Sequence, residues 1–130
     1  MSIKYSVVVE KFAERHYIKT FAKKYGRAWD ITFEALVREF QSFDVLFERN
    51  ISETIVVAAD IKICKTEFKV AGKPESRHRS GNRCIAAINE VKGTVNVLLV
   101  YSKTDIGGGK ETATRKNIIR TNYPEYRDLF

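Results

Sequence analysis

Positive charge is concentrated between residues 62 and 83, where Lys and Arg outnumber carboxylates by seven to two. This window carries most of the net charge of +7 of the 130-residue chain. Lys and Arg at this density bind phosphate groups, and Arg holds two phosphate oxygens in a planar fork. The distribution predicts a binding face for a polyanion, although a solvated basic edge strand is the alternative. The seven cations are Lys62, Lys65, Lys69, Lys73, Arg77, Arg79 and Arg83.

His78 lies inside this basic stretch, between Arg77 and Arg79. It is the one side chain there that titrates near neutrality, so it is the best candidate for a general acid or base. The alternative is an exposed loop histidine that contributes only to binding. We assign no role to His16, which lies on a predicted helix away from the basic stretch.

Two predicted strands, 83–89 and 94–102, flank the short turn EVKG. An antiparallel hairpin brings its outer ends together, so Arg83 and Lys103 should meet at one sheet edge. Alternatively, Arg83 only caps the end of its strand and Lys103 is only a solvated lysine. On strict alternation, Val95, Val97, Leu99, Tyr101 and Lys103 share one face of the second strand.

The N-terminal part predicts a strand over 5–9 and then a hairpin of two helices. Gly26 should end the first helix, and Asp30 is a plausible N-cap for the second. The apolar stripe of the second helix runs from Trp29 to Phe40 and can continue through Phe43 and Phe47.

Residues 51–60 are ambiguous between a strand and a loop, but 61–70 alternate clearly. Cys64, Thr66 and Phe68 should face the core, and Lys65, Glu67 and Lys69 should face outward. Residues 71–82 predict a loop, and 105–110 a flexible linker. A short helix should begin at Glu111, with Ala113, Ile118 and Ile119 inside and Arg115 outside.

These elements predict one α+β domain over residues 1–130: an N-terminal strand, a two-helix hairpin, a three-stranded antiparallel sheet and a short C-terminal helix. No apolar run is long enough to span a membrane and the N-terminus lacks a signal-peptide layout, so we expect a cytoplasmic protein. Cys64 and Cys84 should be buried free thiols. No metal site or cofactor is expected, because residues at ligand spacing are lacking.

Three motifs between residues 65 and 105 carry a resemblance to a known family. The first is KTEFKV, which precedes a basic, Gly-containing loop. The second is SGNRCIAAI at the start of a strand, and the third is LLVYSKTD at the end of the next strand. The segment GGGKETATRKNIIR follows the third motif. In this order they resemble the RelE/ParE superfamily of toxins from toxin–antitoxin systems, most closely the HigB-like members of the RelE branch. One departure is Asn82, where the family prefers an aromatic residue.

The resemblance implies an endoribonuclease that cleaves mRNA on the ribosome and is held inactive by a cognate antitoxin. Arg83, Lys103 and Lys65 would be catalytic together with His78, whereas Lys69, Lys73, Arg77 and Arg79 would bind RNA. Tyr101 could stack on a base, although packing in the core is the alternative. The rival functions are inhibition of DNA gyrase, as in ParE-like toxins, and non-catalytic binding of RNA or protein on the same scaffold.

RNA cleavage of this type uses the 2′-hydroxyl as the nucleophile on the adjacent phosphate. It needs a base near that hydroxyl, positive charge beside the phosphate and an acid at the leaving 5′ oxygen. Arg and Lys supply the charge, and a lysine crowded by other cations can act as a base, which Lys65 or Lys69 would do.

Overall fold

The computed structural model describes residues 4–106 and 110–130, which form a five-stranded mixed sheet with helices on both faces. The strands are β1 (Ser6–Val9), β2 (Ser52–Ala58), β3 (Ile61–Phe68), β4 (Asn82–Asn89) and β5 (Thr94–Ser102), in the spatial order β1-β5-β4-β3-β2. β1 pairs with β5 in parallel, and the other neighbours are antiparallel.

The three-stranded sheet predicted from the sequence is therefore wrong in its strand number. The antiparallel core of β3, β4 and β5 is present, and β1 and β2 extend it on either side. β2 is irregular between Thr54 and Val56, which interrupts the alternation that would have marked it as a strand. β1 joins by pairing with residues 94–97, a long-range contact that no local pattern reports.

The N-terminal helical hairpin is present with corrected ends. A helical run made of α1 (Lys11–Ala13), the π-helical η1 (Glu14–Ile18) and α2 (Lys19–Tyr25) ends at Gly26, whose φ of +56° favours glycine. Gly26 also precedes α3 (Arg27–Gln41), so Asp30 lies within the first turn of α3 and is not its N-cap. Ser42 separates α3 from α4 (Phe43–Glu48), which contains both Phe43 and Phe47.

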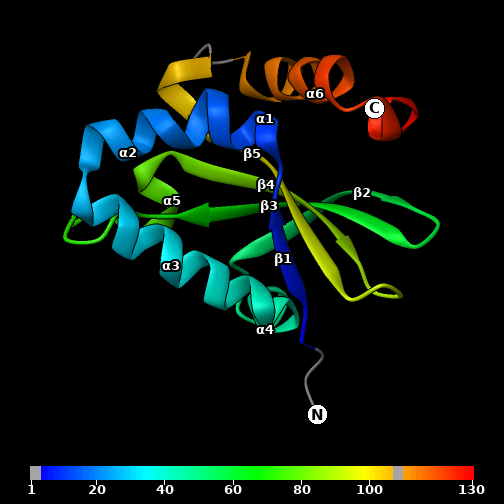
Figure 1. Ribbon diagram of the computed structural model, residues 1–130, viewed down its shortest axis with the longest axis horizontal. Coiled ribbons are helices and arrows are strands. Elements are labelled where there is room, and N and C mark those ends of the chain that lie inside the picture. Colours follow the sequence, from blue (N-terminus) through cyan, green and yellow to red (C-terminus); the bar gives the residue numbers. More distant parts are fainter. Residues whose placement is uncertain (1–3, 107–109) are drawn as a thin grey trace.

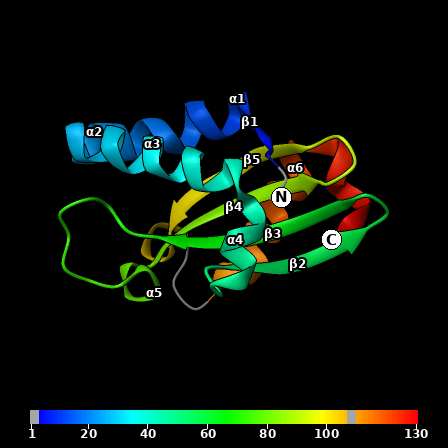
Figure 2. The ribbon, with the colours of Figure 1, turned by 90° about the horizontal axis from the view of Figure 1, so that it is seen from below.

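The helical hairpin covers one face of the sheet, as Figure 2 shows for α2 and α3 lying together along the strands. Aromatic rings fill this interface: Phe21 stacks on Trp29, and both contact Phe68 of β3. Cys64 and Cys84 are buried on the same face as free thiols, as predicted, and burial raises the pKa of Cys64 to about 12. This face buries almost only apolar side chains, so it stabilises the fold.

The opposite face is covered by α6 (Glu111–Asn122) and the following 3-10 helix η4 (Pro124–Leu129). Ile119 and Tyr123 are buried there, and Tyr123 contacts Phe12 of α1 edge to face, so α6 lies close to α1 in Figure 1. The prediction for α6 is wrong at two positions: Ala113 is exposed and Arg115 is buried.

A bulge at Leu98 changes the face of β5. Ile85 of β4 pairs with Leu99, but the next residue, Ala86, pairs with Val97, so Leu98 is an extra residue in β5. Val95 and Val97 therefore face the helical hairpin, whereas Leu99 and Tyr101 face α6. The sequence predicted that alternate residues from 95 to 103 share one face of this strand, and the bulge makes that prediction wrong.

The loop 71–82 contains a short helix, α5 (Arg77–Ser80), where the Ser76 hydroxyl accepts a hydrogen bond from the Arg79 amide. Gly81, with φ +74°, ends α5, and its carbonyl accepts the Lys103 amide at 2.9 Å. Residues 103–106 form the 3-10 helix η2, and part of the predicted linker, 107–109, lies outside the described residues. Within the described ranges, no helix is long and apolar enough to cross a bilayer.

Candidate functional site

The carboxylate of Glu67 joins the side chains of an arginine and a histidine at the end of β3. Its Oε2 lies 3.0 Å from Nη2 of Arg83 and 2.7 Å from Nδ1 of His78. Glu67 and Arg83 are direct partners in the β3–β4 register, and α5 places His78 beside them. An ionised carboxylate can only accept, so Nδ1 carries a proton; in the neutral imidazole Nε2 then keeps a lone pair.

The two partners of Glu67 differ in their access to solvent. The side chain of His78 is 78% exposed, so Nε2 is open to a ligand. Arg83 is only 1% exposed; it donates from Nη1 to the Asn82 carbonyl at 3.0 Å and from Nη2 to the His78 carbonyl at 3.2 Å. Arg83 thus holds both the Glu67 carboxylate and the backbone of α5, which fixes the imidazole in place.

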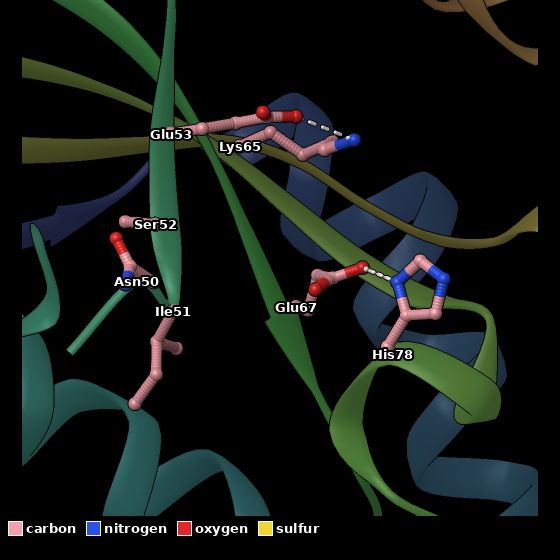
Figure 3. A pocket seen from close by; sticks show the side chains of 7 residues that line it. All are labelled: Asn50, Ile51, Ser52, Glu53, Lys65, Glu67 and His78. Carbon is pink, nitrogen blue, oxygen red and sulfur yellow. Dashed lines mark hydrogen bonds and ion pairs between the residues drawn. The ribbon is translucent and has the colours of Figure 1, made fainter.

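Lys65 lies two residues before Glu67, on the same face of β3, and forms an ion pair of 2.7 Å with Glu53 of β2. The hydrogen bond from Lys65 lowers the pKa of Glu53, with burial acting in the opposite direction. Figure 3 shows the Glu53–Lys65 and Glu67–His78 pairs lining one pocket. This pocket, of about 180 Å³, is lined by Asn50, Ile51, Ser52, Glu53, Lys65, Glu67 and His78.

A second polar cluster lies under the first turn of α6. Tyr101 of β5, which is 1% exposed, donates its hydroxyl proton to Oε1 of Glu111 at 2.8 Å. Nη1 of Arg115 lies 3.5 Å from that hydroxyl oxygen and 3.8 Å from Oε1. Nζ of Lys103 lies 3.9 Å from Oε2 of the same carboxylate. Burial is the main cause that raises the pKa of Tyr101.

The structure brings three of the four predicted catalytic residues, Arg83, His78 and Lys65, to one place. Lys103 belongs to the neighbouring Tyr101–Glu111 cluster. The backbones of residues 82 and 102 pair, as the hairpin predicted, but the side chains of Arg83 and Lys103 turn to different carboxylates. Tyr101 is buried, so the packing in the core that was the alternative to base stacking is the arrangement in this structure.

The predicted RNA-binding cations are divided between two sides of the molecule. Arg77 donates to Oε2 of Glu39 on α3 at 2.7 Å, and Lys73 lies 5.7 Å from the ring centroid of Tyr25. Lys69 lies beyond the end of β3 and lines a groove against α3 together with Arg77. Arg79 is exposed on α5, one residue from His78. Arg77 and Arg79 both neighbour His78 of the Glu67 pocket in the chain, and Arg77 also donates from Nη1 to the Glu67 carbonyl at 3.3 Å.

The sequence analysis missed four charged residues of this region: Glu53, Glu67, Glu111 and Arg115. Glu67 was visible in principle, because it alternates with Lys65 and the hairpin register places it opposite Arg83. Glu111 and Arg115 are four residues apart, and their contact with Tyr101 depends on where α6 docks. No local pattern gives that position.

The five-stranded sheet with a helical hairpin on one face is a RelE-like fold. The protein is similar to one chain in the solved structure of the archaeal RelE–RelB complex from Pyrococcus horikoshii OT3. The TM-score is 0.53 and the sequence identity is 12%. The match covers 77% of this protein and 96% of the chain in the complex. No family model and no curated protein matches the sequence.

Proposed function

We propose that the protein is the toxin of a type II toxin–antitoxin system and cleaves mRNA on the ribosome through the pocket around Glu67. The observation that carries this proposal is the Glu67 carboxylate, which holds a buried arginine on one side and an exposed imidazole on the other. This arrangement offers a positioned base beside a fixed positive charge, and it lies on a RelE-like fold.

In the proposed reaction, Nε2 of His78 takes the proton of the 2′-hydroxyl. The 2′ oxygen then forms a bond to phosphorus, and the bond from phosphorus to the 5′ oxygen breaks. Lys65, released from Glu53, donates a proton to the leaving 5′ oxygen and recovers it from solvent. The products are a 2′,3′-cyclic phosphate and a 5′-hydroxyl end.

Glu67 and Arg83 support this chemistry without exchanging a proton with RNA. Glu67 keeps the imidazole in the tautomer with Nε2 unprotonated and stabilises the imidazolium after it has taken the proton. Arg83 contributes positive charge next to the phosphate, where a fixed cation stabilises the negative charge that develops in the transition state.

Induced expression tests the function and separates it from its rivals. We expect growth arrest with rapid cleavage of translated mRNA, and suppression of both by coexpression of a cognate antitoxin encoded by a neighbouring gene. A DNA-damage response without mRNA cleavage would instead indicate a ParE-like gyrase inhibitor. Absence of toxicity would favour a non-catalytic binding domain.

Substitution of the predicted catalytic cations gives a sharper test. Arg83→Ala should reduce mRNA cleavage by at least about 100-fold, because it removes fixed positive charge near the phosphate, and Lys103→Ala should reduce cleavage through lost positive charge in the neighbouring cluster. Arg83 is 1% exposed, so Arg83→Lys is tested beside it and thermal unfolding of every variant is recorded. Arg38→Ala, at an exposed ion pair on α3, is the matched control. Full activity of both alanine variants would place the site elsewhere.

A further inference from the structure

Two buried side-chain nitrogens have no hydrogen-bond partner in the part of the chain that the structure describes, and both are guanidinium Nε atoms. They belong to Arg83 and Arg115, which are 1% and 6% exposed. The two arginines are on either side of Tyr101: Arg83 is its partner across the β4–β5 register, and Nη1 of Arg115 lies 3.5 Å from its hydroxyl oxygen. A buried charged donor without a partner is costly, which points to an anionic ligand.

The cations around Tyr101 are incompletely neutralised by Glu111. Its carboxylate accepts a hydrogen bond from the Tyr101 hydroxyl at 2.8 Å, whereas the closest nitrogens of Arg115 and Lys103 lie 3.8 and 3.9 Å away. Both distances exceed the ~2.7–2.9 Å of a strong charge-assisted hydrogen bond. One carboxylate thus lies between two cations without a close bond to either.

The position of Glu111 is also favourable for a different anion. Glu111 is the first residue of α6, a helix of 12 residues whose N-cap residue, Lys110, makes no side-chain capping hydrogen bond. Backbone amides at a helix N-terminus favour negative charge and bind phosphate groups. The side chain of Lys103 is 45% exposed, which gives solvent and ligands a path to the cluster.

We propose that Tyr101, Lys103 and Arg115 form a second phosphate subsite, which holds the RNA backbone next to the phosphate bound at the Glu67 pocket. In the protein without RNA, the Glu111 carboxylate occupies this subsite. An incoming phosphate displaces it and accepts hydrogen bonds from Lys103, from Arg115 and from the Tyr101 hydroxyl. This inference rests on the proposed function and extends the RNA-binding surface from the strands onto α6.

The test measures binding of a short single-stranded RNA in which every ribose is 2′-O-methylated, so that it cannot be cleaved. Fluorescence anisotropy over a range of salt concentrations gives the affinity and its salt dependence. Arg115→Gln should weaken binding about tenfold and reduce the log–log salt slope by about 0.7, the value for one phosphate contact on a single strand. Lys116→Gln, an exposed neighbour on the same helix, is the matched control and should change affinity less than twofold.

Glu111→Gln distinguishes a subsite from a structural anchor. Glutamine can still accept from the Tyr101 hydroxyl but does not compete with phosphate, so RNA should bind several-fold more tightly than to the wild type. If Glu111 were only a structural anchor, Glu111→Gln would bind RNA as tightly as the wild type or more weakly, and its melting temperature would be lower. That result would overturn the proposal. Arg115→Lys serves as the second variant if Arg115→Gln does not fold.

The outcomes separate this subsite from the proposed function. Cleavage of mRNA by the wild type, with Arg115→Gln binding like Lys116→Gln, would reject the subsite alone. Binding of the methylated RNA in the predicted order, without any cleavage of mRNA, would reject the proposed function and keep the subsite. Failure of the wild type to bind the methylated RNA would reject the subsite.

Discussion

The sheet face under α6 has two halves that differ sharply. The apolar half consists of Ile63, Ile85, Ala87, Leu99, Ile119 and Tyr123, and the charged half of Lys65, Glu67, Arg83, Tyr101, Lys103, Glu111 and Arg115. The halves follow each other along the same strands: Leu99 and Tyr101 of β5, for example, are two residues apart and are both buried.

The difference between the halves separates stability from function. Burial of apolar side chains stabilises the fold by about 25 cal/mol for each Å² removed from water. Burial of an ion pair contributes little, because the cost of desolvation offsets most of the attraction between the charges. Arginines in the charged half are therefore poorly explained by stability, which supports the anion binding that we propose. Three predictions test this division, beginning with the largest effect.

The largest effect is expected for His78→Ala, because the imidazole on α5 pairs with Glu67 of the charged half. Loss of the proposed base should reduce mRNA cleavage by about 10²- to 10⁴-fold, the range for a general acid–base group. The free energy of unfolding should change by less than about 1 kcal/mol, because the side chain is 78% exposed and Glu67 keeps its pair with Arg83. Denaturant titration and primer extension on a translated mRNA measure the two quantities.

His16→Ala is the control for that experiment, since His16 is exposed and lies against Phe12 on the N-terminal helix. Equal cleavage by the two histidine variants would show that His78 contributes no proton transfer. It would then remain only a binding residue of the pocket.

In the apolar half, Leu99→Ala should lower stability strongly and leave RNA binding almost unchanged. Leu99 is fully buried, and its truncation should lower the free energy of unfolding by about 2–5 kcal/mol through lost burial and a cavity. Affinity for the 2′-O-methylated RNA, measured below the melting temperature of the variant, should stay within twofold of wild type. A large loss of affinity in fully folded variant protein would show that the two halves are coupled.

The smallest of the three effects is the change in RNA binding for Lys65→Ala, compared with Lys62→Ala on the same strand; the loss of the proposed general acid should in addition reduce cleavage. Both lysines pair with a glutamate, Lys65 with Glu53 at 2.7 Å and Lys62 with Glu90 at 2.6 Å, but on opposite faces of β3. Only Lys65→Ala should reduce the log–log salt slope of RNA binding, by about 0.7. A similar reduction in both variants would mean that the charge of the whole strand, and not the pocket, attracts RNA.

Local patterns predicted the elements of the fold well and their assembly less well. The turn at Gly26, the alternation of β3 and the β4–β5 hairpin were all predicted, because each depends on residues close in sequence. The parallel pairing of β1 and the bulge at Leu98 were missed, since both depend on partners that only the folded chain supplies. The bulge alone reverses the face assigned to Val95 and Val97 relative to Tyr101.

The cationic residues of the candidate site were predicted from the sequence, but its carboxylates were not. Net positive charge directed attention to Arg83, His78 and Lys65, and the structure places these three together. Glu67 was only a minor exception to the basic stretch 62–83, and Glu53 lies outside that stretch, although the two carboxylates hold His78 and Lys65 in position. Arg115 was assigned to the outside, because a lone arginine on a short helix is usually exposed.

The parallel pairing of β1 with β5 also determines when a newly made chain can fold. Ser6–Val9 pairs with residues 94–97, so this edge of the sheet closes only after residue 97 of 130 has left the ribosome. The helices of the N-terminal half emerge earlier and must wait for the strands that bury their apolar faces. Contacts between such distant segments slow folding.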